Sequence, residues 1–363
     1  MDFLSSIPFL STAIAIIISW ALFAILCSLA QEAVAQLIAD RGRFMRKYIL
    51  KQLQDYPNGV NWGSLLYLHG SVDLLSRANN KPTNYISPDL FAKTLIDVVG
   101  SSHLVQMQIQ MVKEKAKKIE FIDQVNNYEH STLYNFKAAT QLLKPSDLVA
   151  FFQQSLKDAE IRANVSSTQD TDKQAKEADI YNYLTGNIEL WYKDFSDRLS
   201  LWYKKHVRQK LLIIGILLGI IINVDSIQLF KFYNINPEAR AAVINYYKEN
   251  KDRLDSLART PDSVWRKMKA ADPRINTNDQ NIISALKKQF TDTLFNATQS
   301  FIRSMDSLQK ATSTPVGTKY NLFVNYKMSL REWWWKLIGI LISGFAASFG
   351  APFWFDVLRK AVR

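Results

Sequence analysis

The sequence predicts an all-α integral membrane protein with three transmembrane helices, and three observations support this fold class. Three long stretches carry no charged side chain: residues 3–31, residues 211–224, which continue past Asp225 to residue 230, and residues 337–355. Basic residues gather beside these stretches, as they do at the cytoplasmic ends of membrane spans. The segments between them show helical periodicity and helix-capping residues. An α-helix of about 20 residues crosses the roughly 30 Å hydrocarbon core, so each stretch is long enough.

The first predicted element is an N-terminal transmembrane helix over residues 1–30, with its N-terminus outside. Its apolar run follows Asp2 and no basic residue, whereas a cleaved secretory signal has a positive leader. Cys27, the only cysteine, lies within this helix. A lone cysteine excludes an intrachain disulfide and a cysteine-based zinc site. We expect Cys27 to be a small apolar packing residue.

Residues 31–210 are predicted to form a cytoplasmic helical domain. Both of its ends are strongly basic, with DRGRFMRKYILK after the first span and RLSLWYKKHVRQK before the second. Positively charged flanks of membrane spans stay in the cytoplasm. Each basic residue near anionic headgroups contributes about 1 kcal/mol to the attraction for the membrane surface. Ser87 followed by Pro88 predicts a helix start. The polar stretch 164–179 is predicted to be a loop.

The last part of this domain repeats the tetrapeptide Leu-Trp-Tyr-Lys in ELWYKDFSDRLSLWYKKHVRQK. Its tryptophans, Trp191 and Trp202, are separated by about three helical turns and therefore face the same way. Two interpretations remain open. The segment is either an interfacial helix that leads into the second span or a helix buried in the cytoplasmic bundle.

The second predicted transmembrane helix covers residues 211–230 and contains Asn223 and Asp225. These residues lie about 20 Å along the helix from Lys210, in the outer part of the membrane core or at its edge. Inserting an ionisable side chain at that depth of the membrane costs about 3 kcal/mol, so its presence suggests a functional role. The alternative is that Asp225 marks the position where the helix reaches the outer interface.

Residues 231–332 are predicted to form a smaller extracytoplasmic helical domain. Asn236 with Pro237 and Glu238 predicts one helix start, and Thr260 with Pro261 and Asp262 predicts another. An apolar stripe over residues 282–308 predicts a longer helix.

The third predicted transmembrane helix covers residues 333–358, and a short cytoplasmic tail follows over residues 359–363. Tryptophans stand near both ends, where their amphipathic rings suit the headgroup region: Trp333, Trp334, Trp335 and Trp354. Small residues recur every four positions and predict a close helix contact: Gly339, Ser343, Ala347 and Ala351. That contact is either with the chain's own spans or with another molecule, which is a second copy or a partner protein.

The sequence contains no pattern typical of a catalytic site. The four histidines are far apart in the sequence, and none pairs with a carboxylate or another histidine at a metal-ligand spacing: His69, His103, His130 and His206. The sequence has no phosphate-binding glycine loop, nucleophile elbow or dinucleotide fingerprint. A pI near 9.5 is not accompanied by a nucleic-acid-binding motif. We therefore expect no enzyme activity, no metal, no cofactor and no nucleic-acid partner.

Several blocks resemble an uncharacterised family of bacterial inner-membrane proteins, to which no biochemical activity is assigned. They are NKPTNYISPDLFAKTLIDVV, SDRLSLWYKKHVRQK, NVDSI, NPEARAAV and SFGAPFWFDVLRK. The resemblance implies bacterial origin, location in the inner (plasma) membrane and a multi-pass helical architecture. It marks the following residues as members of recurring blocks: Asp197, Trp202, Asn223, Asp225, Gly350, Pro352 and Asp356. Pro352 after Gly350 is expected to kink the last helix, and Asp356 is expected to meet Arg359 or Lys360.

Two functional hypotheses follow. The first is a non-enzymatic membrane anchor or scaffold that links cytoplasmic and extracytoplasmic protein partners. The second is an oligomeric transport or ion-conducting component that uses Asn223 and Asp225, because three helices alone rarely enclose a pore. A lipid-modifying enzyme ranks behind both, since no acid and base pair has a recognisable geometry. Membrane lipid is the common partner, and both hypotheses allow a homo-oligomer.

Overall fold

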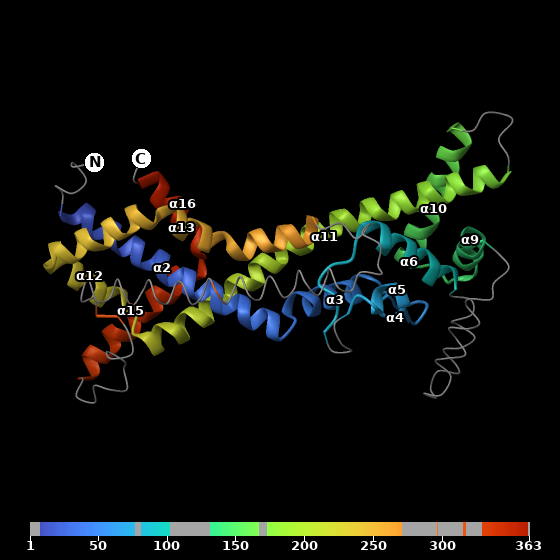
Figure 1. The fold of residues 1–363 in the computed structure, drawn as a ribbon. Coiled ribbons are helices and arrows are strands. Elements are labelled where there is room, and N and C mark those ends of the chain that lie inside the picture. Colours follow the sequence, from blue (N-terminus) through green and yellow to red (C-terminus); the bar gives the residue numbers. More distant parts are fainter. Residues whose placement is uncertain are drawn as a thin grey trace. The chain divides into compact units, whose positions relative to one another are not determined.

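The computed structural model describes residues 8–76, 81–101, 131–166, 173–270, 296, 315–316 and 329–361. These residues are almost entirely helical, which confirms the predicted all-α class (Figure 1). The chain divides into two compact units. Unit 1 contains Met1–Leu37 and Lys204–Arg363, and unit 2 contains Ile38–Tyr203.

Unit 2 holds six helices in full among its described residues, together with the first part of α11 and the two-stranded antiparallel pair β1–β2. Their bounds are α3 (Asp40–Gln52), β1 (Gln54–Asp55), β2 (Val60–Asn61), α4 (Trp62–Leu68), α5 (Gly70–Asp73), α6 (Pro88–Gly100), α9 (Thr132–Leu142), α10 (Asp147–Ser166) and α11 (Lys173–Ile222). Helix α6 starts as predicted, because the Ser87 hydroxyl accepts a hydrogen bond from the Leu90 N–H at 3.3 Å and Pro88 occupies the first turn.

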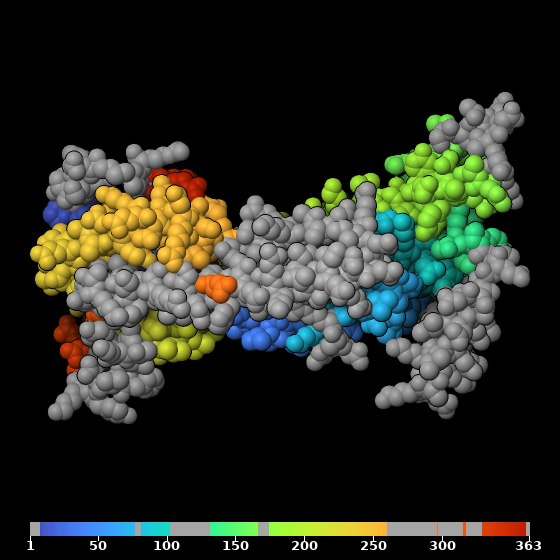
Figure 2. Space-filling view, viewed as in Figure 1, coloured from blue at the N-terminus to red at the C-terminus, as the bar shows by residue number. Residues whose placement is uncertain are grey.

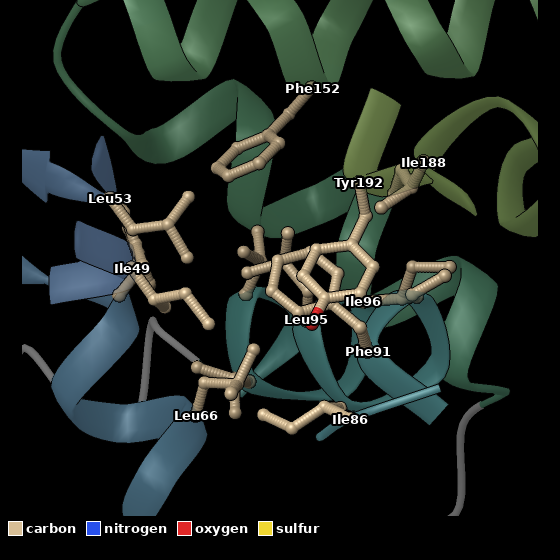
Figure 3. Close-up of a cluster of buried hydrophobic side chains, with 14 of the residues drawn as sticks. Ile49, Leu53, Leu66, Ile86, Phe91, Leu95, Ile96, Phe152, Ile188 and Tyr192 are labelled. Carbon is tan, nitrogen blue, oxygen red and sulfur yellow. The ribbon is translucent and has the colours of Figure 1, made fainter. Parts of the chain in front are cut away.

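The core of unit 2 is built around aromatic rings from distant segments. The rings of Phe91 and Tyr192 stack with their centroids 3.9 Å apart, and the Phe152 ring packs edge-on against Trp62 at 6.2 Å. Figure 3 shows Phe91, Phe152 and Tyr192 converging with aliphatic side chains from α3, α4 and α6. Burial raises the pKa of the Tyr192 phenol well above its ordinary value. Unit 2 therefore has a hydrophobic core of its own.

A buried carboxylate ties the β1–β2 hairpin to this core. Asp55 is 2% exposed, and its Oδ2 accepts hydrogen bonds from Trp62 Nε1 at 3.2 Å, Ser146 Oγ at 3.1 Å and Asn58 Nδ2 at 2.9 Å. The turn between the strands contains Gly59 in the left-handed region, with φ of 65°. Residues 56–59 therefore form the hairpin turn between β1 and β2.

Unit 1 is organised around α2 (Pro8–Leu37). The other helices of this unit are the end of α11, α12 (Ser226–Ile235), α13 (Pro237–Ala270), α15 (Leu330–Ser348) and α16 (Ala351–Ala361). Helix α2 packs against α12, α13, α15 and α16. Its sequence is apolar on every side, which is typical of a membrane span or of a helix in a protein core. Most of its side chains between Ser11 and Glu32 are buried within unit 1.

Among the described residues, one helix, α2, is long and apolar enough to cross a membrane. The number rises to three if two bent pairs each count as a span: α11 with α12, which are bent by 55°, and α15 with α16, which are bent by 87°. The sequence predicted one straight helix over residues 211–230 and one helix over residues 333–358 with a kink near Pro352. The structure instead breaks the first at residues 223–225 and the second at residues 349–350.

Helix α13 differs most from its predicted setting. Residues 231–332 were expected to form a separate domain, yet α13 belongs to unit 1 and runs beside α2 (Figure 1). Arg240 Nη1 reaches Thr12 Oγ1 at 3.3 Å, and Arg259 Nη2 lies 2.8 Å from Asp356 Oδ1. The predicted topology would instead separate these two residues by a hydrocarbon core of roughly 30 Å, with Arg259 outside and Asp356 at the inner end of the third span. The structure places their side chains in contact.

The outward face of α13 is charged. Figure 2 shows this helix at the surface of unit 1, and its exposed residues include Lys248, Glu249, Lys251, Asp252 and Arg253. The buried stripe is apolar and contains Ala239, Val243, Tyr247, Leu254 and Ala258. Apolar positions spaced in this way cover the apolar surface of α2 and leave a face suited to water.

Two other predictions concern helix boundaries. Helix α13 runs without a break through residues 260–262, so the second helix start predicted there is wrong. The loop predicted over residues 164–179 is also too long, because α10 extends to Ser166 and α11 begins at Lys173. The stripe predicted over residues 282–308 lies outside the described residues, apart from residue 296.

Candidate functional site

The polar site singled out by the sequence is a helix break with two defined caps. Helix α11 stops because Asn223 adopts the left-handed conformation, with φ of 54°, and the Val224 N–H bonds back to the Gly219 carbonyl at 3.0 Å. This pattern is a Schellman motif with asparagine in the position usually taken by glycine. The sequence NVDS carried this signal, since asparagine favours the left-handed region.

Asp225 starts the next helix. Its Oδ1 accepts hydrogen bonds from the Ile227 N–H at 2.9 Å and the Gln228 N–H at 3.1 Å. These are two of the backbone donors that the first turn of α12 would otherwise leave without a partner. Asp225 is 5% exposed, and the nearby positive charges of Lys231 and Lys336 interact with it. The carboxylate is therefore held by the helix that it caps.

Gly339 makes room for this carboxylate. A Cβ at position 339 would overlap Asp225 Oδ1 and would lie 2.6 Å from Asp225 Cγ. One turn further along α15, the Ser343 hydroxyl lies 2.7 Å from that of Ser226, whose oxygen also accepts a hydrogen bond from Trp20 Nε1 at 2.9 Å. Three segments thus meet at one polar contact: α2, α12 and α15.

The small residues of α15 face the chain's own helices. A Cβ built on Gly215 would lie 3.1 Å from the Ala347 Cβ, and a Cβ built on Gly344 would lie 2.7 Å from Ile216 Cγ1. Gly339, Ser343 and Ala347 are buried, and so is Ala351. Of the two alternatives for this stripe, the described contacts are therefore those of packing within one chain.

Asn223 has a less complete set of partners. Its Nδ2 donates to the Pro315 carbonyl at 3.2 Å and to Gln228 Oε1 at 3.4 Å. Its Oδ1 is buried without a hydrogen-bond partner among the described residues. A buried acceptor without a donor is costly, so this atom is the part of the site that capping does not explain.

The second break lies at Gly350, which has φ of 82° and follows the last turn of α15. Its N–H bonds to the Ala347 carbonyl at 2.9 Å, and Pro352 lies in the first turn of α16, where proline is tolerated. The expected kink near Pro352 is therefore a sharp turn between two helices. The left-handed φ explains the glycine.

Asp356 has more partners than the sequence suggested. It lies 3.9 Å from Arg359, the expected neighbour on α16, but its shorter contact is with Arg259 of α13 at 2.8 Å. Asp255 lies 3.1 Å from Arg259 and 3.2 Å from Arg359, which closes a four-residue network. Both carboxylates raise the pKa of the Arg259 guanidinium through hydrogen bonds. The network joins α13 to α16.

The tryptophans proposed for the membrane interface have different surroundings. Trp333, Trp334 and Trp335 are exposed. Trp202 is 44% exposed, and its ring lies 5.3 Å from Tyr48. Trp191 is partly buried in the core of unit 2, as in the bundle alternative, with its ring stacked 5.6 Å from Phe195.

Trp354 differs from its predicted interfacial setting, because it is 9% exposed within unit 1. Its ring lies 5.0 Å from Trp20, and its Nε1 donates to the Ala346 carbonyl at 2.7 Å. The 87° bend after α15 turns this side chain toward α2.

Unit 2 contains one pair that sequence reasoning missed. His69 Nε2 lies 3.0 Å from Asp97 Oδ2, while His69 Nδ1 accepts a hydrogen bond from the Ser71 N–H at 3.3 Å. Both ring nitrogens are therefore occupied by structural contacts. Within the described ranges, no group of three or more histidine, cysteine, aspartate or glutamate side chains lies close enough to hold a metal ion.

Comparison of the chain with protein-family models, with curated proteins and with solved structures found no match in any of the three.

Proposed function

We propose that this chain is a non-enzymatic anchor in the bacterial inner membrane, and that it holds unit 2 in the cytoplasm as a scaffold for protein partners. The proposal extends to partners on the extracytoplasmic face, as the sequence suggested. It is supported by the division into two units, because unit 2 has its own core and is joined to the apolar helices at both ends. The basic flanks of unit 2 favour its location in the cytoplasm.

The observation that carries the proposal is the use of the Asp225 carboxylate. An ionisable group in an apolar helix suggests transport or chemistry by default. Here the carboxylate accepts two backbone N–H groups and occupies the space left by Gly339. These contacts are architectural, which favours an anchor over a catalyst or a channel.

The experiment is site-specific photo-crosslinking in living cells. A photoreactive residue replaces Leu142 or Leu190, which are 71% and 61% exposed on unit 2. The control positions are Leu95 and Ile96, which are buried. We expect protein adducts from the exposed positions alone, and we expect the captured protein to leave the membrane fraction when Leu142 is replaced by Asp. The scaffold proposal fails if no exposed position of unit 2 yields an adduct.

A second candidate function is an oligomeric transport or ion-conducting component. It is favoured by one observation, namely that Asn223 Oδ1 is buried without a described partner and so offers an acceptor to an ion. Asp225→Asn separates the two functions, because asparagine caps helices about as well as aspartate but carries no charge. An anchor keeps its abundance and partners in this variant, whereas a conducting path loses its flux.

A further inference from the structure

A cluster of aromatic rings joins α3 to α11 within unit 2. The ring centroid of Phe44 lies 4.6 Å from Tyr48 and 5.2 Å from Tyr203, and Tyr48 lies 5.3 Å from Trp202. We call these four residues the aromatic cluster. Two segments that are far apart in the sequence therefore share one surface.

Polar contacts fix the orientation of this cluster. The Tyr203 hydroxyl donates to Asp40 Oδ2 at 3.3 Å, and the Arg41 guanidinium carbon lies 5.6 Å from the centre of the Tyr203 ring. The second contact is a cation–π interaction. Trp202 remains 44% exposed at the edge of the cluster. A half-exposed indole with an apolar body and one N–H donor suits the headgroup region of a bilayer.

A row of positive charges lies beside the cluster on α3. Arg43, Lys47 and Lys51 follow one another at intervals of about one helical turn, and all three are exposed. We call them the basic stripe. Within the part of the chain that the structure describes, none of the three forms an ion pair with a carboxylate. Their charge is therefore open to an external anion.

The chain connects this surface directly to its apolar helices. Helix α3 begins at Asp40, just after α2 ends at Leu37. Helix α11 carries Trp202 and continues without a break to Leu211, where its apolar run begins about 13 Å further along. Cationic segments placed next to a membrane helix attract anionic lipids.

We propose that the aromatic cluster and the basic stripe form a docking surface for the anionic headgroups of membrane phospholipids. Trp202 lies among the headgroups, while Arg43, Lys47 and Lys51 contact their phosphates. This inference rests on the proposed function, because it requires the chain to be anchored in a membrane. It adds a lipid class and the residues that select it.

The test measures lipid selectivity on the purified full-length chain in mild detergent. Phosphatidylglycerol and phosphatidylcholine are titrated separately, and the bound lipid is counted by native mass spectrometry. The test variant replaces all three residues of the basic stripe with glutamine. The control variant makes the same change of charge on unit 2 at three other exposed positions: Lys157, Arg162 and Lys193.

We expect the wild-type chain and the control variant to prefer phosphatidylglycerol. In the basic-stripe variant this preference should fall at least about fivefold, because each charge near a membrane surface contributes about 1 kcal/mol to the attraction for anionic lipid. Trp202→Ser is expected to weaken the preference further. An unchanged preference in the basic-stripe variant overturns the inference, as does an equal loss in the control. Preferential binding of RNA or of an acidic peptide to wild type, without lipid selectivity, also overturns it.

The result separates this inference from the proposed function. A basic-stripe variant that stays in the membrane fraction and keeps its protein partners, yet has wild-type lipid selectivity, contradicts the docking surface alone. A wild-type chain recovered in the soluble fraction contradicts the membrane anchor itself. Circular dichroism shows whether each variant keeps its helical content.

Discussion

The contact between Gly339 and Asp225 gives the most direct test of how the helices of unit 1 pack. In Gly339→Ala, the new methyl group would overlap Asp225 Oδ1 and lie 2.6 Å from Asp225 Cγ, where an ordinary contact is 3.4–4 Å. The carboxylate must rotate away, or α15 must separate from α12. In either case the hydrogen bonds to the Ile227 and Gln228 N–H groups lengthen or break.

The magnitude follows from three effects. Loss of an N-cap costs about 1 kcal/mol, and an extra carbon atom in a well-packed contact costs about 1–3 kcal/mol. Replacing glycine with alanine within a helix stabilises the helix by about 1 kcal/mol, which offsets part of this loss. We therefore expect Gly339→Ala to lower the free energy of unfolding of unit 1 by about 1–3 kcal/mol.

The assay is a double-mutant cycle in mixed micelles, with the free energy of unfolding measured for Gly339→Ala, Asp225→Ala and the double variant. Asp225→Ala removes the cap together with the group that clashes, so the double variant should lose less stability than the two single variants combined, by about 1 kcal/mol or more. Additive effects within about 0.5 kcal/mol, or a Gly339→Ala variant as stable as wild type, would refute the packing that we describe.

Three further predictions concern separate parts of the chain. In a Cys27→Ala background, Arg259→Cys with Asp356→Cys should be joined by a flexible bifunctional maleimide whose spacer replaces the length of the removed side chains, since the native Arg259 and Asp356 side chains meet at 2.8 Å. Gel mobility after treatment gives the answer, and no cross-link is expected if a bilayer separates the two positions. Tyr67→Phe should stabilise unit 2 by about 1 kcal/mol in thermal unfolding, because the Tyr67 hydroxyl is buried without a hydrogen-bond partner among the described residues. Burial also raises the pKa of Tyr67, so the phenol ionises at lower pH in the unfolded chain than in the folded one. The free energy of unfolding should therefore fall above about pH 10, and it should fall less in Tyr67→Phe. Gly186→Ala should stabilise α11 by about 1 kcal/mol, because alanine has the higher helix propensity and no neighbouring atom lies within 4 Å of the added methyl group. Hydrogen exchange in α11 that is unchanged or faster than in wild type would contradict this prediction.

Much of the helical pattern was available from the sequence because its signals are local. Ser87 with Pro88 predicted the start of α6, and the proline after Gly350 predicted an interruption of the last apolar helix. The break at residues 223–225 also has a local signal, with asparagine ending one helix and aspartate starting the next. The sequence nevertheless predicted one straight span over residues 211–230, because the apolar run continues on both sides of this break. Residue composition does not show where the backbone changes direction.

The sequence alone determined that this is an α-helical protein with apolar segments long enough for a membrane, and that it carries basic residues beside them. These properties depend on residue type and short-range spacing. Only the tertiary structure decided that α13 lies along α2, that Trp354 is buried against Trp20, and that Gly339 accommodates Asp225. Each of these contacts joins residues far apart in the chain. The physical reason is that side-chain volume and hydrogen-bond geometry select such partners only after the helices have packed, so no local pattern in the sequence encodes them.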